Sequence, residues 1–130
     1  MARILCVDDE PSILSLKCSI LEGAGHEVTA ALSAHDAVER LARAAYDLVI
    51  TDWRLGNASG QAVVEAAKAR ARTPVIVVSG FLAEAAAAQP RADLYLEKPL
   101  PPQRLVEAVN RLLKPDGEPE GGRVRGKGIG

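Results

Sequence analysis

The stretch Leu48-Val49-Ile50-Thr51-Asp52 runs through four uncharged residues and then ends in a carboxylate. A second stretch of the same kind, Ile4-Leu5-Cys6-Val7, is followed directly by Asp8 and Asp9. Continuous runs of this sort are typical of strands that helices cover on both faces, as in parallel sheets. These two stretches therefore predict inner strands of a parallel sheet, each leading into acidic residues.

Short runs rich in Val, Ile and Leu alternate with stretches of helical period along the chain, which indicates repeated strand and helix units. The expected strands are Arg3–Val7, Glu27–Ala31, Leu48–Thr51, Val75–Ser79 and Leu94–Glu97. The expected helices are Pro11–Glu22, Ala34–Arg43, Gly60–Arg70, Leu82–Gln89 and Pro102–Leu113. The run Glu27–Ala31 alternates more in polarity, so we expect it at an edge. The fold class predicted is α/β, with a five-stranded parallel sheet.

Composition limits the kind of protein this is. Of the 130 residues, 48% are hydrophobic and 25% charged, and the formal net charge is -1. These values fit one globular domain. With no Lys/Arg stripe on any expected element, they argue against direct nucleic-acid binding. No apolar run is long enough for a membrane span or a signal peptide, so we expect a cytoplasmic protein with no membrane partner.

The two ends of the chain differ in character. From Pro115 onward the sequence consists mostly of Gly, Pro and charged residues with little to bury, so we expect a domain over 1–114 and a flexible tail over 115–130. The cysteines, Cys6 and Cys18, have neither metal-ligand nor redox spacing, and we interpret them as ordinary thiols.

Polar residues follow four of the five expected strands. Asp8 and Asp9 follow the first strand, Asp52 the third, and Lys98 the fifth, while Ser79 ends the fourth. In an open α/β sheet, ligands bind at the carboxyl ends of the strands. These side chains therefore predict a single site at that edge of the sheet.

The acidic residues at this edge require a counter-charge. Two carboxylates at about 4 Å repel each other by about 4 kcal/mol at an effective dielectric of about 20. Mg²⁺, which binds carboxylates, waters and phosphate oxygens, would neutralise them, and Lys98 adds a fixed cation. A carboxylate beside these cations can attack a phosphorus centre, and the Ser79 hydroxyl could then bond a phosphoryl oxygen.

Five segments resemble, in order and at nearly the usual spacing, the signature segments of response-regulator receiver domains. They are Val7-Asp8-Asp9-Glu10-Pro11, Leu48-Val49-Ile50-Thr51-Asp52-Trp53-Arg54-Leu55, Ser59-Gly60, Val75-Ile76-Val77-Val78-Ser79-Gly80 and Tyr95-Leu96-Glu97-Lys98-Pro99. Each segment alone is weak evidence for the family, but the five segments together are highly specific for it. The resemblance covers about residues 3–114 and implies a flavodoxin-like (βα)5 fold, doubly wound, with strand order 2-1-3-4-5.

The resemblance also implies a role for each acidic residue. Asp52 would be the phosphoacceptor, taking a phosphoryl group from a histidine kinase or a histidine phosphotransfer protein. Asp9 and Asp52 would bind Mg²⁺ directly, Asp8 would act mainly through water, and the backbone carbonyl of Arg54 would complete the protein ligands. Such a domain catalyses its own phosphorylation and dephosphorylation and switches its surface for a downstream effector protein or output domain.

Three further residues receive roles in the same way. Ser79 would be the switch hydroxyl and Lys98 the cation that pairs with the phosphate. Tyr95 would be the aromatic that swings inward when Ser79 engages the phosphoryl group, although a half-buried core tyrosine is an equal alternative. The family often has a cis peptide at the position of Lys98-Pro99.

The chain departs from the family pattern in three places. Gly56 stands where a proline is usual, which should loosen the loop after Asp52. Leu100 replaces a common Phe. The stretch from Ser79 to Lys98 is short, so we expect a short helix between them.

Three other functions are compatible with parts of this pattern. An aspartyl-nucleophile phosphohydrolase usually has a second acid two residues after its nucleophile, where this chain has Arg54. A flavodoxin-like cofactor binder would cradle a phosphate in its first loop, which Asp8 and Asp9 would repel. A degenerate receiver acting only in protein interaction ranks last, because every acidic and cationic position is filled.

Overall fold

The structure, a computed structural model, describes residues 1–113 and contains one five-stranded parallel sheet in the order β2-β1-β3-β6-β7. Its strands are β1 (Arg3–Val7), β2 (Glu27–Ala31), β3 (Leu48–Asp52), β6 (Val75–Ser79) and β7 (Leu94–Glu97). This order is the predicted 2-1-3-4-5 order, with β2 at an edge as expected, so the predicted fold is confirmed. The expected tail, 115–130, lies outside the described residues.

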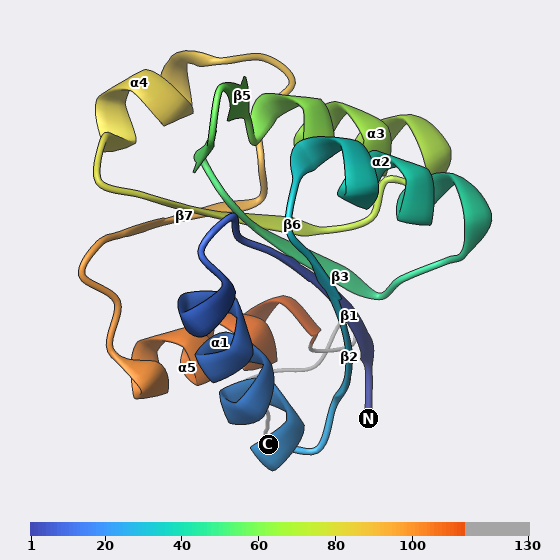
Figure 1. Cartoon of the computed structure of the whole chain (residues 1–130), viewed down its shortest axis with the longest axis vertical. Helices are drawn as coiled ribbons and strands as arrows, with labels where there is room; N and C mark the ends of the chain where they lie inside the picture. Colours follow the sequence, from blue (N-terminus) through green and yellow to red (C-terminus); the bar gives the residue numbers. More distant parts are fainter. Residues whose placement is uncertain (114–130) are drawn as a thin grey trace, which may run out of the picture.

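Helices cover both faces of the sheet, with α1 and α5 on one face and α2, α3 and α4 on the other (Figure 1). They are α1 (Pro11–Gly23), α2 (Ala34–Arg43), α3 (Gln61–Ala71), α4 (Leu82–Ala87) and α5 (Pro102–Leu113). Within residues 1–113, none of these helices has both the length and the apolar character that crossing a membrane requires.

Two hydrophobic cores follow from the alternation of side chains along the inner strands. Leu5 and Val49 belong to the core on the side of α2 and α3, while Ile4 and Ile50 belong to the core on the side of α1 and α5. Successive residues of a strand point to opposite faces, so an uninterrupted apolar run fills both cores at once. The strand β3 is buried at all of its positions and is the centre of the sheet.

The helix ends follow local signals. Pro11 is the first residue of α1, and the Ser33 hydroxyl oxygen accepts a hydrogen bond from the Asp36 backbone N–H at 3.0 Å, capping α2. The helix α4 is short, as predicted, but it ends at Ala87 and not at Gln89. Pro90 ends the helix, but such a proline can stand one to three residues beyond the last helical position, so the exact end could not be placed from the sequence.

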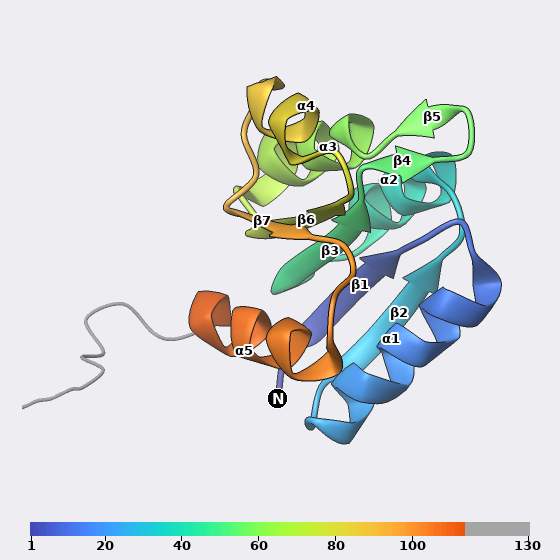
Figure 2. The ribbon, with the colours of Figure 1, turned by 90° about the vertical axis from the view of Figure 1, so that its left-hand side faces the viewer.

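A small hairpin after β3 was not predicted. It pairs β4 (Arg54–Leu55) with β5 (Ala58–Ser59) in antiparallel fashion. Figure 2 shows this hairpin at the end of the sheet where α1 begins. Strands of two residues are too short to produce a periodic pattern, which is why the sequence did not reveal them.

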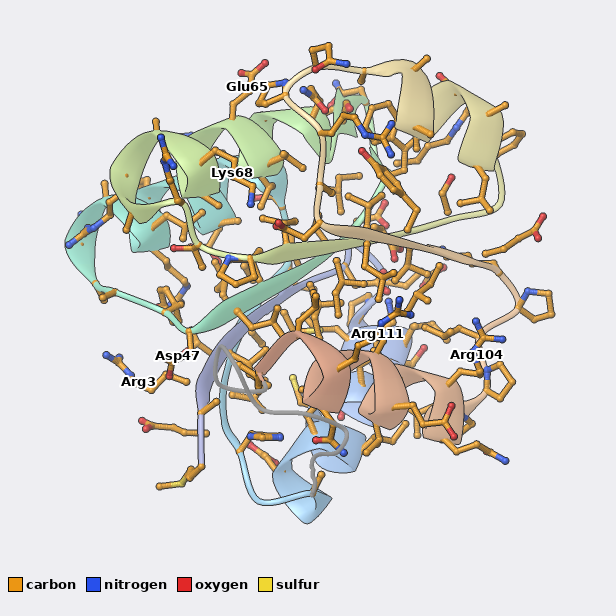
Figure 3. All side chains as sticks on the ribbon, turned by 180° about the vertical axis from the view of Figure 1, so that it is seen from behind. Arg3, Asp47, Glu65, Lys68, Arg104 and Arg111 are labelled. Carbon is orange, nitrogen blue, oxygen red and sulfur yellow. The ribbon has the colours of Figure 1, made fainter. Side chains whose placement is uncertain are left out.

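The opposite end of the sheet is closed by backbone and side-chain contacts. The Arg3 backbone N–H donates to Asp47 Oδ2 at 2.8 Å, and the Arg3 guanidinium donates to the carbonyl of Ala45 at 3.1 Å. Figure 3 shows Arg3 and Asp47 close together at this amino end. The acidic residues that follow β1 and β3 lie at the other end.

Candidate functional site

The carboxyl ends of β1 and β3 bring three carboxylates together. In the parallel pairing of these strands Val7 lies opposite Thr51, so Asp8 and Asp52 leave the sheet side by side. One oxygen each of Asp8, Asp9 and Asp52 lies within 4.8 Å of the others. Opposite ligands of Mg²⁺ are separated by roughly 4 Å, twice its bond length, so a small adjustment of this oxygen set fits that ion.

The three carboxylates differ in exposure. Asp8 and Asp52 are only 1% and 3% exposed, whereas Asp9 faces solvent. Asp8 Oδ1 accepts a hydrogen bond from the Glu10 backbone N–H at 3.0 Å, and Asp9 Oδ2 accepts one from the Gly56 backbone N–H at 2.9 Å. The two buried carboxylates therefore need cations nearby, because burying an unpaired charge is costly.

The first such cation is Lys98, which follows β7. Its ammonium donates to Asp52 Oδ2 at 3.1 Å, and its backbone N–H donates to the carbonyl of Ser79 at 2.9 Å. The peptide bond from Lys98 to Pro99 is cis, as expected. The side chain is 46% exposed, so its charge is held at the rim of the site.

The second cation is Lys17, which we did not predict from the sequence. Its ammonium donates to Asp8 Oδ2 at 3.0 Å and to Asp52 Oδ1 at 3.1 Å, and its side chain is only 9% exposed. The sequence did contain a signal, because Lys17 falls between Leu14 and Leu21 on the buried face of α1. A charged residue in an apolar stripe requires a buried partner.

The charges of Asp52 and Lys17 depend on each other. Burial raises the pKa of the Asp52 carboxyl above its ordinary value, and the Lys17 ammonium beside it only partly opposes that rise. Burial alone would lower the pKa of Lys17, but the charges of Asp52 and Asp8 outweigh it and raise that pKa. Lys17 is therefore an ammonium at neutral pH, held in place by two carboxylates.

Ser79 ends β6, one residue beyond Val78, which lies opposite Asp52 in the sheet. It is 3% exposed, and its hydroxyl oxygen accepts a hydrogen bond from the Phe81 backbone N–H at 2.7 Å. The strand β6 thus places Ser79 at the same edge as Asp52 and Lys98, as the sequence predicted for this edge.

Arg54 and Phe81 form an exposed pair next to the site. The Arg54 guanidinium carbon lies 4.1 Å from the centre of the Phe81 ring, and Arg54 Nη2 donates to Glu84 Oε1 at 3.2 Å. These contacts join the hairpin after β3 to the start of α4. Two partners, Phe81 and Glu84, therefore hold the side chain of Arg54, which lies two residues after Asp52.

Tyr95 has a different environment from the other predicted site residues. Its hydroxyl oxygen accepts a hydrogen bond from the Ala92 backbone N–H at 2.8 Å, and the Arg91 guanidinium carbon lies 5.0 Å from the centre of its ring. The ring is partly buried against the core beneath α2 and α3. These contacts belong to a half-buried tyrosine, and its role as a moving aromatic stays a prediction.

Two glycines shape the loop after Asp52. A Cβ at Gly60 would lie 2.2 Å from the Asp52 carbonyl oxygen, so only glycine fits there. Gly56 has a φ of 65°, and its N–H donates to Asp9. The proline usual at this position could neither adopt that φ nor donate that bond. In this loop Gly56 therefore adds a contact to Asp9.

A parallel sheet with buried carboxylates and lysines at its carboxyl edge is the arrangement of a phosphoryl-accepting signalling domain. The family model of the response regulator receiver domain matches residues 4–110, and the chain belongs to this family. It is therefore a receiver domain of two-component signal transduction, a signalling phosphoacceptor.

Curated relatives contain this domain as one part of a longer chain. The sequence is 33% identical over 114 residues to the transcriptional regulatory protein ZraR of Salmonella typhimurium, covering 85% of this chain and 26% of that protein. It is 30% identical over 118 residues to the phosphate regulon transcriptional regulatory protein PhoB of Klebsiella pneumoniae, covering 86% of this chain and 52% of that protein. The chain therefore spans about a quarter to a half of these two relatives.

Solved structures share the whole fold. A receiver domain protein from Clostridium thermocellum has a TM-score of 0.80 and 32% identity, covering 87% of this chain and 94% of that one. The response regulator TrrA from Thermotoga maritima, in complex with Mg²⁺ and BeF, has a TM-score of 0.79 and 30% identity. The match covers 87% of this chain and 100% of that one.

Proposed function

We propose that this chain accepts a phosphoryl group on Asp52 from a histidine kinase or a histidine phosphotransfer protein, in a Mg²⁺-dependent reaction in the cytoplasm. One observation carries the proposal: Asp52 ends the central strand with one carboxylate oxygen on each of two ammonium groups, beside Asp8 and Asp9. Lys98 on one side, and Mg²⁺ held by the carboxylates on the other, would withdraw charge from an incoming phosphoryl group, so that the carboxylate can attack it.

The three carboxylates would hold the metal. Asp9 and Asp52 are assigned as direct ligands, Asp8 as a ligand acting mainly through water, and the Arg54 backbone carbonyl as the last protein ligand. Mg²⁺ bound there would neutralise phosphoryl oxygens in the transition state. The exposure of Asp9 supports a direct role, since its second oxygen is open to an ion while Gly56 holds the first.

Lys98 and Ser79 would bind the phosphoryl group once it is on Asp52. The Lys98 ammonium already lies 3.1 Å from Asp52 Oδ2, so it would lie next to phosphoryl oxygens carried by that residue. A hydroxyl can accept and donate at the same time. Ser79 can therefore donate to a phosphoryl oxygen while it keeps its hydrogen bond from Phe81.

The output of the domain would be a change of surface. In this proposal Ser79 moves toward the phosphoryl group, Tyr95 follows it, and a downstream effector protein or output domain recognises the new surface. For Tyr95 this requires release of the Ala92 N–H and of the Arg91 contact. The same site would also catalyse loss of the phosphoryl group.

Labelling with acetyl phosphate tests the proposal directly. The wild type is expected to take up phosphate in the presence of Mg²⁺, and Asp52→Asn is expected to take up none. Beryllofluoride with Mg²⁺ should change the fluorescence of Trp53, which is buried directly after Asp52. Full labelling of Asp52→Asn would contradict the assignment of the phosphoacceptor.

A further inference from the structure

Lys17 occupies the position between two of the carboxylates that the proposed function assigns to the metal. Its ammonium bonds Asp8 Oδ2 at 3.0 Å and Asp52 Oδ1 at 3.1 Å, while the other oxygens of these residues are bonded by Glu10 and Lys98. All four oxygens of Asp8 and Asp52 thus have a donor from the protein itself.

A cation between two carboxylates neutralises part of their negative charge, as a metal ion at the same place would. The ammonium of Lys17 is a compact point charge with three donors, and it is attached to α1 at a buried position. A divalent ion and this ammonium cannot both lie on the Asp52 Oδ1 side of the carboxylate, since like charges in a buried site repel strongly.

We propose that Lys17 is a built-in competitor of Mg²⁺: its ammonium must leave Asp52 before the three carboxylates can close around the ion. The proposal rests on the proposed function, because it assumes that Asp8, Asp9 and Asp52 are the metal ligands. It assigns to this chain a weaker Mg²⁺ affinity than the same carboxylates would have without Lys17.

The structure provides room for the displaced side chain. Lys17 and Lys98 both line a cavity of about 500 Å³ between α1 and α5. Ile13 and Leu16, which also line this cavity, are 42% and 55% exposed, so it opens to solvent. This cavity is where we place the Lys17 ammonium once it is displaced. Long lysine side chains often bury their methylene stem and keep the charge in water in this manner.

The charge balance gives the competition its direction. The Lys17 side chain is buried, and its ammonium donates to Asp8 at 3.0 Å and to Asp52 at 3.1 Å. Lys17 therefore depends on Asp8 and Asp52, whereas the carboxylates could exchange it for an ion of higher charge. Lys98 sits on the other oxygen of Asp52 and does not stand between the carboxylates.

The first experiment measures Mg²⁺ affinity by titration calorimetry, with no phosphodonor present. Lys17→Met keeps most of the side-chain volume and removes the charge, and it should bind Mg²⁺ about tenfold more tightly or better, comparable to other changes beside a metal's ligands. Lys68→Met is the matched control, because Lys68 lies on α3 with Asp93 as its partner (Figure 3). An unchanged or weaker affinity in Lys17→Met would overturn the proposal.

The second experiment uses the wild type and is independent of how well the variant folds. Protein labelled with ¹⁵N-lysine and treated with EDTA should show a protected ammonium signal from Lys17 in its NMR spectrum. Addition of Mg²⁺ should remove that signal, as the side chain moves to solvent. Persistence of the signal at saturating Mg²⁺ would also overturn the proposal, since it would mean that ion and ammonium share the site.

These outcomes are separate from those that test the phosphoacceptor. Both experiments measure metal binding without phosphorylation, so a failure of Asp52→Asn to lose labelling would reassign the phosphorylated residue and leave the competition intact. Conversely, a chain in which Lys17 and Mg²⁺ share the site while Asp52 is still phosphorylated would contradict the competition and leave the phosphoacceptor assignment intact.

Discussion

Two lysines bind opposite oxygens of the Asp52 carboxylate at the same distance of 3.1 Å, yet they come from different regions of the molecule. Lys98 follows β7 at the rim of the site and is 46% exposed, while Lys17 lies on the buried face of α1 and is 9% exposed. The distances alone would suggest equal roles. This difference in burial supports our proposal that Lys17 acts mainly on the fold and on metal binding, and Lys98 mainly on the phosphoryl group.

The largest expected effect concerns folding stability. In EDTA, Lys17→Ala should lower the free energy of unfolding by about 3 kcal/mol, because it leaves two buried carboxylates without their shared partner. Lys98→Ala should cost less than about 1 kcal/mol, since water screens a half-exposed ion pair. Urea denaturation measures both values, and equal losses in the two variants would contradict the comparison.

The next effect concerns the rate of phosphorylation. Lys98→Ala should slow labelling by acetyl phosphate roughly a hundredfold, the usual cost of removing one charge aimed at a transition state. The assay is the initial rate of phosphate uptake at saturating Mg²⁺. Lys68→Ala serves as the control, since it removes a lysine outside the site. A rate near that of the wild type would show that Lys98 has no part in the transfer.

A smaller effect separates the two acidic residues after β1. In EDTA, Asp8→Asn should destabilise the fold by about 1 to 2 kcal/mol, because it weakens the buried hydrogen bond to Lys17. Asp9→Asn should stabilise it by less than about 1 kcal/mol, because Asp9 is exposed and its removal relieves repulsion. Thermal or urea unfolding would reveal the opposite signs. With Mg²⁺, Asp9→Asn should weaken ion binding more than Asp8→Asn, and the reverse order would exchange their roles.

The smallest effect concerns the lifetime of the phosphorylated state. Arg54 and Phe81 are stacked beside the site, and we expect them to obstruct the water that attacks the phosphorus. Arg54→Ala and Phe81→Ala should therefore both lose phosphate a few times faster than the wild type, measured after removal of the phosphodonor. Slower loss in Arg54→Ala would instead indicate that Arg54 stabilises the transition state, as an arginine finger does.

Most of the site could be predicted because its residues follow strands. Asp8, Asp9, Asp52, Ser79 and Lys98 each come at or directly after the end of a strand, and parallel strands bring those ends to one edge. Site residues on helices are harder to predict, because the strand residues that a helical side chain contacts depend on how the helix is rotated against the sheet. Lys17 was therefore missed, although its place in an apolar stripe demanded a partner.

The sequence by itself determined the order of strands and helices, the two-sided burial of the inner strands and the gathering of charge at one edge. Those features depend on local apolar patterns and on the general geometry of parallel sheets. Only the tertiary structure decided that Lys17 reaches Asp8 and Asp52, that Gly56 bonds Asp9, and that Tyr95 is tied to Ala92. The first two contacts depend on the packing of elements that are far apart in the sequence, and the third depends on the side-chain rotamer of Tyr95; no apolar pattern encodes either.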